Sequence, residues 1–342
     1  MSDKINYKTW FNNNKQTLIS SAHVPAEATA ELKLLLEYLC DLPYSKFLIC
    51  GEDEIKEENL KKLDKAVQKL LTGTPVDHII GKRWFMGLEF EIDENTLIPR
   101  QETELLVEKA FNSVMADINE SASVSQAVLA ASDDQNAEYR ILDLCTGSGC
   151  IIISLAKLLE EKLHGLIKDS SGRDYNAIGN DAKIEYYASD ISEKALMKAS
   201  ENAKKHDVHV KFIRSDMFED IRKFSSDNRF YELSFNMIIS NPPYISKAEM
   251  EKLDKKVSEH DPYAALYGGE DGLDFYRIIA EQAKDYLTNG GRLLLEIGYE
   301  QGESVKKLLE VQGYTNIEIL KDYSGLDRVV TSRITNNSVK SN

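Results

Sequence analysis

The sequence predicts an α/β protein in which a small helical domain precedes a mostly parallel sheet covered by helices on both faces. Three observations support this fold class. Apolar, strand-like segments alternate with helical patterns from residue 139 onward, leucines recur at helical spacing before residue 77, and 342 residues suffice for one large and one smaller domain.

The first 77 residues contain two amphipathic helical patterns. Pro25 suits a first helical turn, and Gly73, Thr74 and Pro75 end the second helix. The apolar positions are 32, 35, 36 and 39 in the first pattern and 60, 63, 67, 70 and 71 in the second. We therefore expect a helical domain over residues 1–77.

A connecting segment follows over residues 78–100. Leu88, Phe90 and Ile92 alternate with glutamates, the period-two pattern of a half-buried strand, which predicts a β-hairpin. Arg100 and Glu104 lie where this connector meets the next domain, and either could contact a ligand or only hold the domains together. We expect the main domain over residues 101–335 and a frayed tail over 336–342.

The main domain contains seven candidate strands. Two stretches rich in small polar residues, about 115–137 and 164–183, interrupt the alternation, and their composition indicates surface insertions. The predicted strands are 141–144, 185–189, 209–214, 236–240, 292–297, 316–320 and 328–332.

Composition narrows the possible partners. The chain has 57 acidic and 42 basic residues, a formal charge of −15, which disfavours binding to a nucleic-acid backbone. No run of eighteen apolar residues occurs, and the first residues lack the apolar core of a secretory signal, so we expect a cytoplasmic protein with no membrane contact. Four cysteines and six histidines without ligand spacing predict neither disulfides nor a metal site.

The first predicted strand runs into Cys-Thr-Gly-Ser-Gly, residues 145–149, and a helix pattern follows. Glycine lets a backbone turn approach a ligand closely because it has no Cβ atom. The alternative is a tight strand-to-helix turn without a ligand.

Acidic residues end the next two strands. Asp190 is placed to accept hydrogen bonds from both ribose hydroxyls, while Ser192 is the better candidate for the helix N-cap. Asp216 could accept an adenine amino proton, and Met217 or Phe218 could cover the base, although Asp216 could equally be an ordinary loop residue. Three strand ends thus predict a site for an adenosine-containing cofactor.

The most specific feature is Asn-Pro-Pro-Tyr at residues 241–244, directly after the fourth strand. Two consecutive prolines fix the backbone and remove two N–H donors, so acceptors dominate this corner. The Asn241 side-chain oxygen and the Pro242 carbonyl can each accept one hydrogen of a planar NH₂ group, while Tyr244 packs beside it. This arrangement predicts a site that orients a weakly nucleophilic amide or amine nitrogen.

These motifs resemble the class I S-adenosylmethionine-dependent amino-group methyltransferases, and the surrounding residues resemble the release-factor glutamine N5-methyltransferases, the PrmC or HemK family. The resemblance covers nearly everything from residue 75 to 333. Beyond the motifs above, the matching residues are 97–100, 102–104, 261–262, 265–266, 268–269, 271–273, 296–298, Gln301, Asp322, Gly325 and Arg328.

The resemblance implies a seven-stranded Rossmann-like sheet with its last strand antiparallel, a helical domain that contacts the substrate protein, and a glutamine substrate in the Gly-Gly-Gln motif of peptide chain release factors. S-adenosyl-L-methionine is the implied cofactor. Cys145 replaces a frequent glycine of the family, Gln101 a frequent proline and Met217 a frequent aromatic residue. The implied cofactor residues are Cys145, Thr146, Gly147, Ser148, Gly149, Asp190, Met217 and Asn241, and the implied catalytic residues are Asn241, Pro242, Pro243 and Tyr244.

Two other functions remain open at this point. A nucleic-acid methyltransferase acting on adenine N6 or guanine N2 would use the same acceptors, but the net charge and the lack of a basic recognition module disfavour it. A catalytically silent, cofactor-binding partner subunit is disfavoured by the intact Asn-Pro-Pro-Tyr motif. Glu296 lies at the end of the fifth predicted strand, and a structural role is one interpretation of it.

Overall fold

The computed structural model describes residues 5–21, 23–128, 139–165, 184–221 and 233–335. The chain forms two compact units. The helical unit comprises Met1–Arg83, Ile92–Glu94 and Leu253–Asp261, and the larger unit comprises Trp84–Glu91, Asn95–Lys252 and Pro262–Asn342.

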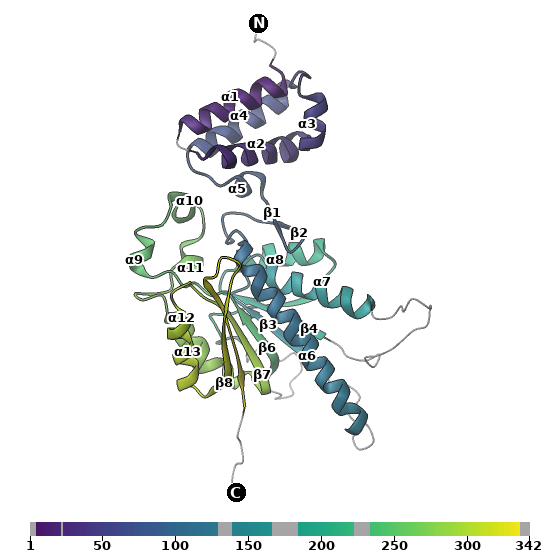
Figure 1. The fold of residues 1–342 in the computed structure, drawn as a ribbon, viewed down its shortest axis with the longest axis vertical. Helices are drawn as coiled ribbons and strands as arrows, with labels where there is room; N and C mark the ends of the chain where they lie inside the picture. Colours follow the sequence, from purple (N-terminus) through teal and green to yellow (C-terminus); the bar gives the residue numbers. More distant parts are fainter. Residues whose placement is uncertain (1–4, 22, 129–138, 166–183, 222–232, 336–342) are drawn as a thin grey trace. The chain divides into compact units, whose positions relative to one another are not determined.

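The helical unit contains both helices predicted from leucine spacing, and each begins close to the expected position (Figure 1). Pro25 occupies the first turn of its helix, as its fixed φ favours. Trp10 and Leu18 of an unpredicted first helix complete the apolar core. The helices of this unit are α1 (Tyr7–Ser20), α2 (Pro25–Cys40), α3 (Tyr44–Cys50), α4 (Glu57–Leu71), α5 (Val76–Ile80) and α10 (Lys255–Ser258).

The connector forms the predicted hairpin from β1 (Lys82–Phe85) and β2 (Leu88–Glu91). Met86 and Gly87 both have positive φ, +50° and +75°, as a two-residue turn of this kind requires. The buried side chain of Asn202 bonds to both backbone groups of Glu91, at 2.8 and 2.9 Å, and so fastens β2 to the helix over residues 193–205.

The larger unit has the predicted seven-stranded sheet, in the order β5-β4-β3-β6-β7-β9-β8. The first five of these strands are parallel to one another, and β9 is antiparallel to both of its neighbours, as the family resemblance implies. The strands are β3 (Tyr139–Leu144), β4 (Ile184–Asp190), β5 (Val210–Arg214), β6 (Phe235–Ser240), β7 (Leu287–Glu296), β8 (Tyr314–Lys321) and β9 (Asp327–Ile334).

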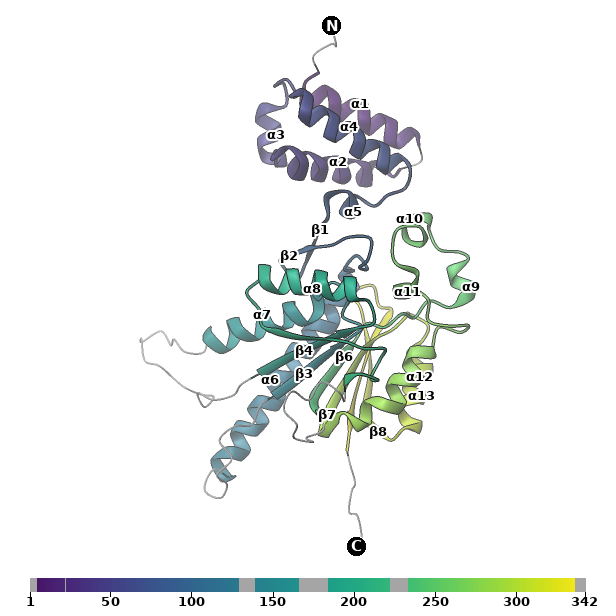
Figure 2. The same ribbon diagram turned by 180° about the vertical axis from the view of Figure 1, so that it is seen from behind.

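Successive strand residues enter different cores because side chains alternate across a sheet. Ile239 and Leu294 pack in the core with α6, α7 and α8, whereas Ile238 and Leu295 pack in the core with α12 and α13. Figure 2 shows α12 and α13 next to each other, near the end of the sheet that β8 forms. The helices are α6 (Glu104–Val128), α7 (Cys150–Gly165), α8 (Glu193–Lys205), α9 (Lys247–Met250), α11 (Tyr263–Leu266), α12 (Asp274–Gln282) and α13 (Gly302–Val311), with 3₁₀ helices η1 (Gln101–Thr103) and η3 (Ala283–Asp285).

The expected insertion at 115–137 is wrong over its first part, because α6 continues to Val128. Val114 and Ile118 extend the helical spacing of buried residues, and Asp117 accepts hydrogen bonds from Arg292 and Arg333, at 2.6 and 2.9 Å between Oδ1 and Nη2. Apolar spacing is the better guide here, because Val114 and Ile118 continue the helical pattern where composition indicates an insertion.

Most of the second expected insertion and the expected tail lie outside the described residues. Within the described ranges, no helix combines the length and apolar character needed to cross a membrane.

Candidate active site

The predicted site residues follow the carboxyl ends of neighbouring parallel strands. Cys145 follows β3, Asp190 ends β4, Met217 follows β5 and Asn241 follows β6. Parallel strands present these ends at one edge of the sheet, which is where open α/β sheets bind ligands. The topology therefore brings segments almost 100 residues apart in the chain to one edge.

The glycine turn has the backbone that its composition predicts. Cys145, Gly147 and Gly149 have φ values of +63°, +56° and +80°, in the left-handed region that favours glycine. A Cβ atom built on Gly147 would meet no atom within 4 Å, so this backbone is open to a ligand. A Cβ on Gly149 would lie 2.9 Å from Ile153 Cδ1, so Gly149 serves helix packing.

Asp190 joins two of these segments. Its Oδ2 accepts a hydrogen bond from Gly147 N and its Oδ1 accepts one from Ser192 N, each at 2.9 Å. Burial raises the pKa of Asp190, while these backbone hydrogen bonds lower it. Each oxygen keeps a lone pair for a further donor such as a ribose hydroxyl. Ser192 caps α8 by accepting from Ala195 N at 3.2 Å, as expected.

The two candidate base-covering residues have different surroundings. Met217 is buried and its sulfur lies 4.0 Å from the sulfur of Cys145, which places it beside the glycine turn. Phe218 stacks on Tyr286 with ring centroids 4.8 Å apart, within the core. The structure thus leaves Met217 as the apolar neighbour of the turn and assigns Phe218 to packing, whereas Asp216 is exposed.

Asp143 is a functional candidate that the sequence analysis did not single out. Its side chain is buried, Oδ2 accepts a hydrogen bond from the Thr146 hydroxyl at 2.6 Å, and Oδ1 has no hydrogen-bond partner among the described residues. Burial raises the pKa of Asp143 to about 7. A buried acid with an unused acceptor behind the glycine turn is a perturbed group of the kind that binding sites contain.

The Asn-Pro-Pro-Tyr corner is fastened to its surroundings on several sides. Pro242 and Pro243 are buried, and the preceding Ser240 hydroxyl donates to Leu144 O at 2.6 Å, which ties the start of the corner to the end of β3. Burial raises the pKa of Tyr244, so this phenol stays protonated at neutral pH. The corner is therefore a rigid group of acceptors rather than a flexible loop.

A second support holds the end of the corner. Gln301 Nε2 donates to Tyr244 O at 2.9 Å and to Gly272 O at 3.2 Å, while its Oε1 accepts from Gly298 N at 2.9 Å. A Cβ atom on Gly268 would lie 2.7 Å from both Pro243 O and Tyr244 Cα. These residues belong to the motifs that carry the family resemblance, but no pattern in the sequence indicated which contact each one makes.

The connector residues Arg100 and Glu104 have different contacts. Glu104 Oε1 accepts a hydrogen bond from Met86 N at 2.8 Å, which is a structural contact to the hairpin turn. Arg100 interacts electrostatically with Tyr244 and lowers its pKa. The positive charge of Arg100 thus acts on the Asn-Pro-Pro-Tyr corner, whereas the hydrogen bond of Glu104 is to the hairpin turn.

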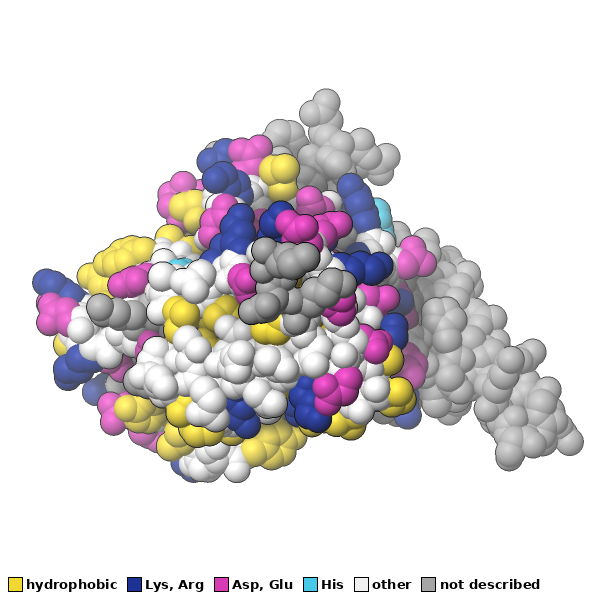
Figure 3. Space-filling view, turned by 90° about the horizontal axis from the view of Figure 1, so that it is seen from above, with side chains coloured by type: hydrophobic (Ala, Val, Ile, Leu, Met, Phe, Trp, Pro, Cys, Tyr) yellow, Lys and Arg dark blue, Asp and Glu magenta, His cyan; other side chains and the backbone are white. Residues whose placement is uncertain are grey.

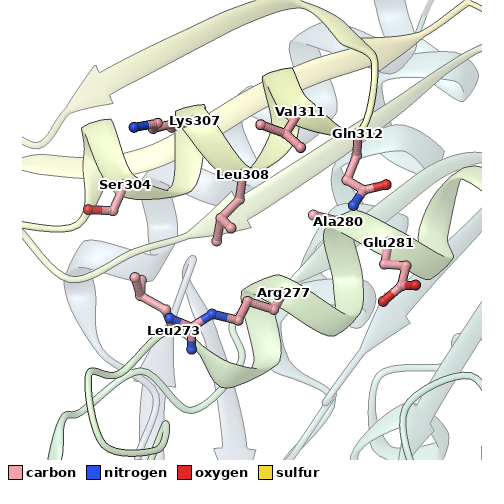
Figure 4. A pocket seen from close by; sticks show the side chains of 9 residues that line it. All are labelled: Leu273, Arg277, Ala280, Glu281, Ser304, Lys307, Leu308, Val311 and Gln312. Atoms are coloured by element: carbon pink, nitrogen blue, oxygen red, sulfur yellow. The ribbon is translucent and has the colours of Figure 1, made fainter.

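A separate cavity of about 380 Å³ lies between α12 and α13 (Figure 4). None of the predicted site residues lines it, so it is distinct from the edge of the sheet described above. Its lining residues are Leu273, Arg277, Ala280, Glu281, Ser304, Lys307, Leu308, Val311 and Gln312. Within the described part of the chain, no group of histidine, cysteine and acidic side chains is arranged to hold a metal ion.

Comparisons with known proteins identify the family. A family model described as the PrmC N-terminal domain matches residues 17–81, and one described as an RMKL-like methyltransferase domain matches residues 115–259. The chain is 34% identical over 278 residues to the release factor glutamine methyltransferase of Thermodesulfovibrio yellowstonii, covering 81% of this chain and 82% of the relative. The chain belongs to the release factor glutamine methyltransferases. This membership confirms the resemblance inferred from the sequence motifs.

Other relatives differ in length. The release factor glutamine methyltransferase of Streptococcus pneumoniae is 31% identical over 94% of this chain and 95% of its own. The bifunctional methyltransferase of Rickettsia felis is 34% identical over 88% of this chain, which spans only 53% of that longer protein. A solved protein-(glutamine-N5) methyltransferase from Alicyclobacillus acidocaldarius is 22% identical, with 72% of this chain and 99% of that chain covered and a TM-score of 0.35.

Enzymes of this family use S-adenosylmethionine, and the edge of the sheet fits this cofactor. The open backbone face of Gly147, the remaining lone pairs of Asp190 and the apolar Met217 suit a methionine chain, a ribose and a base, respectively. The acidic side chains of Asp143 and Asp190 also suit a ligand that carries a positive sulfonium centre. The residues present therefore fit the cofactor that the family requires.

Proposed function

We propose that this chain methylates the side-chain amide nitrogen, N5, of the glutamine in the Gly-Gly-Gln motif of peptide chain release factors. The observation that carries the proposal is the buttressed Asn-Pro-Pro-Tyr corner, a set of acceptors suited to one planar NH₂ group, at the edge of the sheet that fits the cofactor. The relatives' names, release factor glutamine methyltransferase, supply the substrate class.

The main chemical difficulty is the weak nucleophilicity of an amide nitrogen, whose lone pair is delocalised. Asn241 Oδ1 and Pro242 O would each accept one N–H hydrogen of the glutamine amide. These two contacts aim the nitrogen lone pair and stabilise the positive charge that develops as it attacks. S-adenosylmethionine, when bound, supplies an electrophilic methyl group on a positively charged sulfur.

The step is a direct in-line displacement. A nitrogen–carbon bond would form as the methyl carbon–sulfur bond breaks, the electron pair of the broken bond would stay on sulfur, and one N–H proton would leave to water after the transfer. Tyr244 would pack beside the amide plane. The prolines have no N–H group, so no backbone donor of their own competes with the substrate for the acceptors. Asp190 would hold the cofactor ribose, and residues 145–149 with Met217 would surround the rest of the cofactor.

The alternative substrate is an exocyclic amine of a nucleic-acid base. The acceptors would suit it, but such an enzyme also needs a cationic surface for phosphates. Lysine, arginine and acidic side chains are interspersed on the described part of the face in Figure 3, and the chain carries a net charge of −15. Charge therefore favours a protein substrate.

Transfer of a radiolabelled methyl group tests the proposal. We expect label in a release factor containing Gly-Gly-Gln, no label when that glutamine is replaced by glutamate, and none in duplex DNA or transfer RNA. Label in a nucleic acid with an unlabelled release factor would instead support the alternative.

A further inference from the structure

The buried carboxyl group of Glu296 is the strongest candidate for a further role, because the steps above do not use it. Glu296 ends β7, and its side chain is 1% exposed. Its Oε2 atom has no hydrogen-bond partner among the described residues. A buried carboxyl oxygen without a hydrogen-bond partner lowers the stability of the folded state, so its presence indicates a role other than packing.

The register of the sheet places this acid beside the Asn-Pro-Pro-Tyr corner. Ser240 of β6 is paired with Leu295 of β7, and these strands are parallel, so the next residues, Asn241 and Glu296, are also neighbours. Thr103, from η1 before α6, reaches the same place, where its hydroxyl accepts from Asn241 Nδ2 at 3.4 Å. The side chains of Thr103 and Asn241 both favour the ionised form of the Glu296 carboxyl and lower its pKa.

The donor and acceptor rules then determine which end of the Asn241 amide faces the substrate. A carboxylate can only accept hydrogen bonds. The Thr103 hydroxyl accepts from Asn241 Nδ2, so its single hydrogen is free to be donated to an ionised Glu296. The NH₂ end of Asn241 is then directed to the protein, and its oxygen remains for the substrate amide.

We propose that Glu296 is a positioning residue that, acting directly and through Thr103, holds the Asn241 amide with its oxygen toward the glutamine substrate. This inference rests on the proposed function. A protonated Glu296 can donate a hydrogen bond to the Asn241 oxygen, which would occupy or rotate away the acceptor that the substrate needs. The ionised form is therefore the competent one.

The Glu296 carboxyl titrates in a pH range where enzyme activity can be measured. Burial raises the pKa of Glu296 to about 7, while the polar side chains of Thr103 and Asn241 lower it. The positive charge of Arg328 lowers this pKa and the negative charge of Glu102 raises it. Glu296 also interacts with Tyr244, Tyr276 and Cys150, which remain neutral near pH 7 because burial raises their pKa values.

The direct test is Glu296→Gln, which keeps the shape of the side chain but gives it a donor. We expect kcat for methyl transfer to a Gly-Gly-Gln release factor to fall about tenfold or more, as misplaced catalytic groups do. The Kd of the cofactor product, S-adenosylhomocysteine, should change by less than about twofold by calorimetry. In the wild type, kcat should rise with pH through about 7, and this rise should be absent from Glu296→Gln.

Two further variants separate positioning from simple loss of structure. Thr103→Val removes the relaying hydroxyl and should lower kcat, whereas Thr103→Ser keeps it and should retain kcat near the wild-type value. Glu102→Gln, at an exposed position, removes a negative charge that raises the Glu296 pKa, so the rise of kcat should move to lower pH with the same plateau.

Wild-type kcat in Glu296→Gln, a rise through pH 7 that persists in that variant, or equal kcat for the two Thr103 variants would overturn the inference. Failure of the proposed function is distinguishable from these outcomes, since the wild-type enzyme would then transfer no methyl group to the release factor at all.

Discussion

The cofactor half and the substrate half of the site are built in different ways. Around the cofactor, the important features are local: Cys145, Gly147 and Gly149 have positive φ within one turn, and Asp190 ends the adjacent strand. Around the substrate, the Asn-Pro-Pro-Tyr corner is local, but the residues that support it come from distant parts of the chain.

These supports are Thr103 before α6, Gly268 after α11, Glu296 at the end of β7 and Gln301 before α13. The comparison teaches that binding a cofactor needs one well-shaped turn, whereas orienting a small NH₂ group needs side chains that are themselves held from several directions. Variants in the cofactor half should therefore lower the affinity for the cofactor, whereas variants in the substrate half should lower kcat.

The largest effect is expected for Asn241→Ala. This variant removes the acceptor that is used most strongly as charge develops on the attacking nitrogen, so kcat should fall by about 10²-fold or more. Affinity for S-adenosylhomocysteine, measured by calorimetry, should stay close to that of the wild type. Loss of that affinity would reassign Asn241 to the cofactor half.

Two glycine variants give a matched comparison between the halves. In Gly268→Ala, the added methyl would lie 2.7 Å from Pro243 O and Tyr244 Cα and should displace the corner, lowering kcat by about 10-fold or more. In Gly147→Ala, the methyl meets open space, and the left-handed backbone costs about 1–2 kcal/mol, so cofactor affinity should fall more than kcat at saturation. The reverse pattern in steady-state kinetics would contradict the proposed division.

Asp190→Ala should act mainly on cofactor affinity. Its loss leaves the N–H groups of Gly147 and Ser192 without their acceptor and removes the proposed ribose partner, which should weaken binding by about 1–3 kcal/mol. Asp216→Ala is the control, since this acid is exposed on the next strand end and should matter less. Calorimetric titration with S-adenosylhomocysteine measures both, and an unchanged affinity in Asp190→Ala would refute its role.

The smallest expected effect is on stability. The pKa of Glu296 is raised on folding, so its stabilising contribution is full below the unfolded pKa and is lost as pH rises through about 7. Relative to the wild type, Glu296→Gln should therefore gain unfolding free energy between pH 5.5 and pH 8, by about 1–2 kcal/mol. Urea unfolding at both pH values checks this, and a difference that stays constant or reverses would count against a buried, titrating Glu296.

The fold was largely predictable from the sequence because its signals are periodic. The seven strands lie within a few residues of their predicted ranges, and the helix from Pro25 to Cys40 has the expected ends. The failure came at 115–128, where composition indicated an insertion although Val114 and Ile118 continue the buried stripe of α6. In that stretch periodicity was the better guide than composition.

The site was predictable only where its geometry is local. A glycine turn and two consecutive prolines constrain their own backbone, so residues 145–149 and 241–244 could be singled out directly. The contacts of Thr103 and Gln301 depend on how distant segments meet, and no spacing in the sequence encodes that. Glu296 appeared structural because burial and strand position are all that the sequence indicates for it.

Tandem mass spectrometry of a Gly-Gly-Gln release factor, after incubation with S-adenosylmethionine and the enzyme, tests the central claim most directly. With the wild type we expect one added methyl group on the side-chain nitrogen of that glutamine, and with Asn241→Ala almost none over the same time. A methyl group on another residue, or equal modification by both enzymes, would contradict the claim that residues 241–244 hold the glutamine amide for transfer.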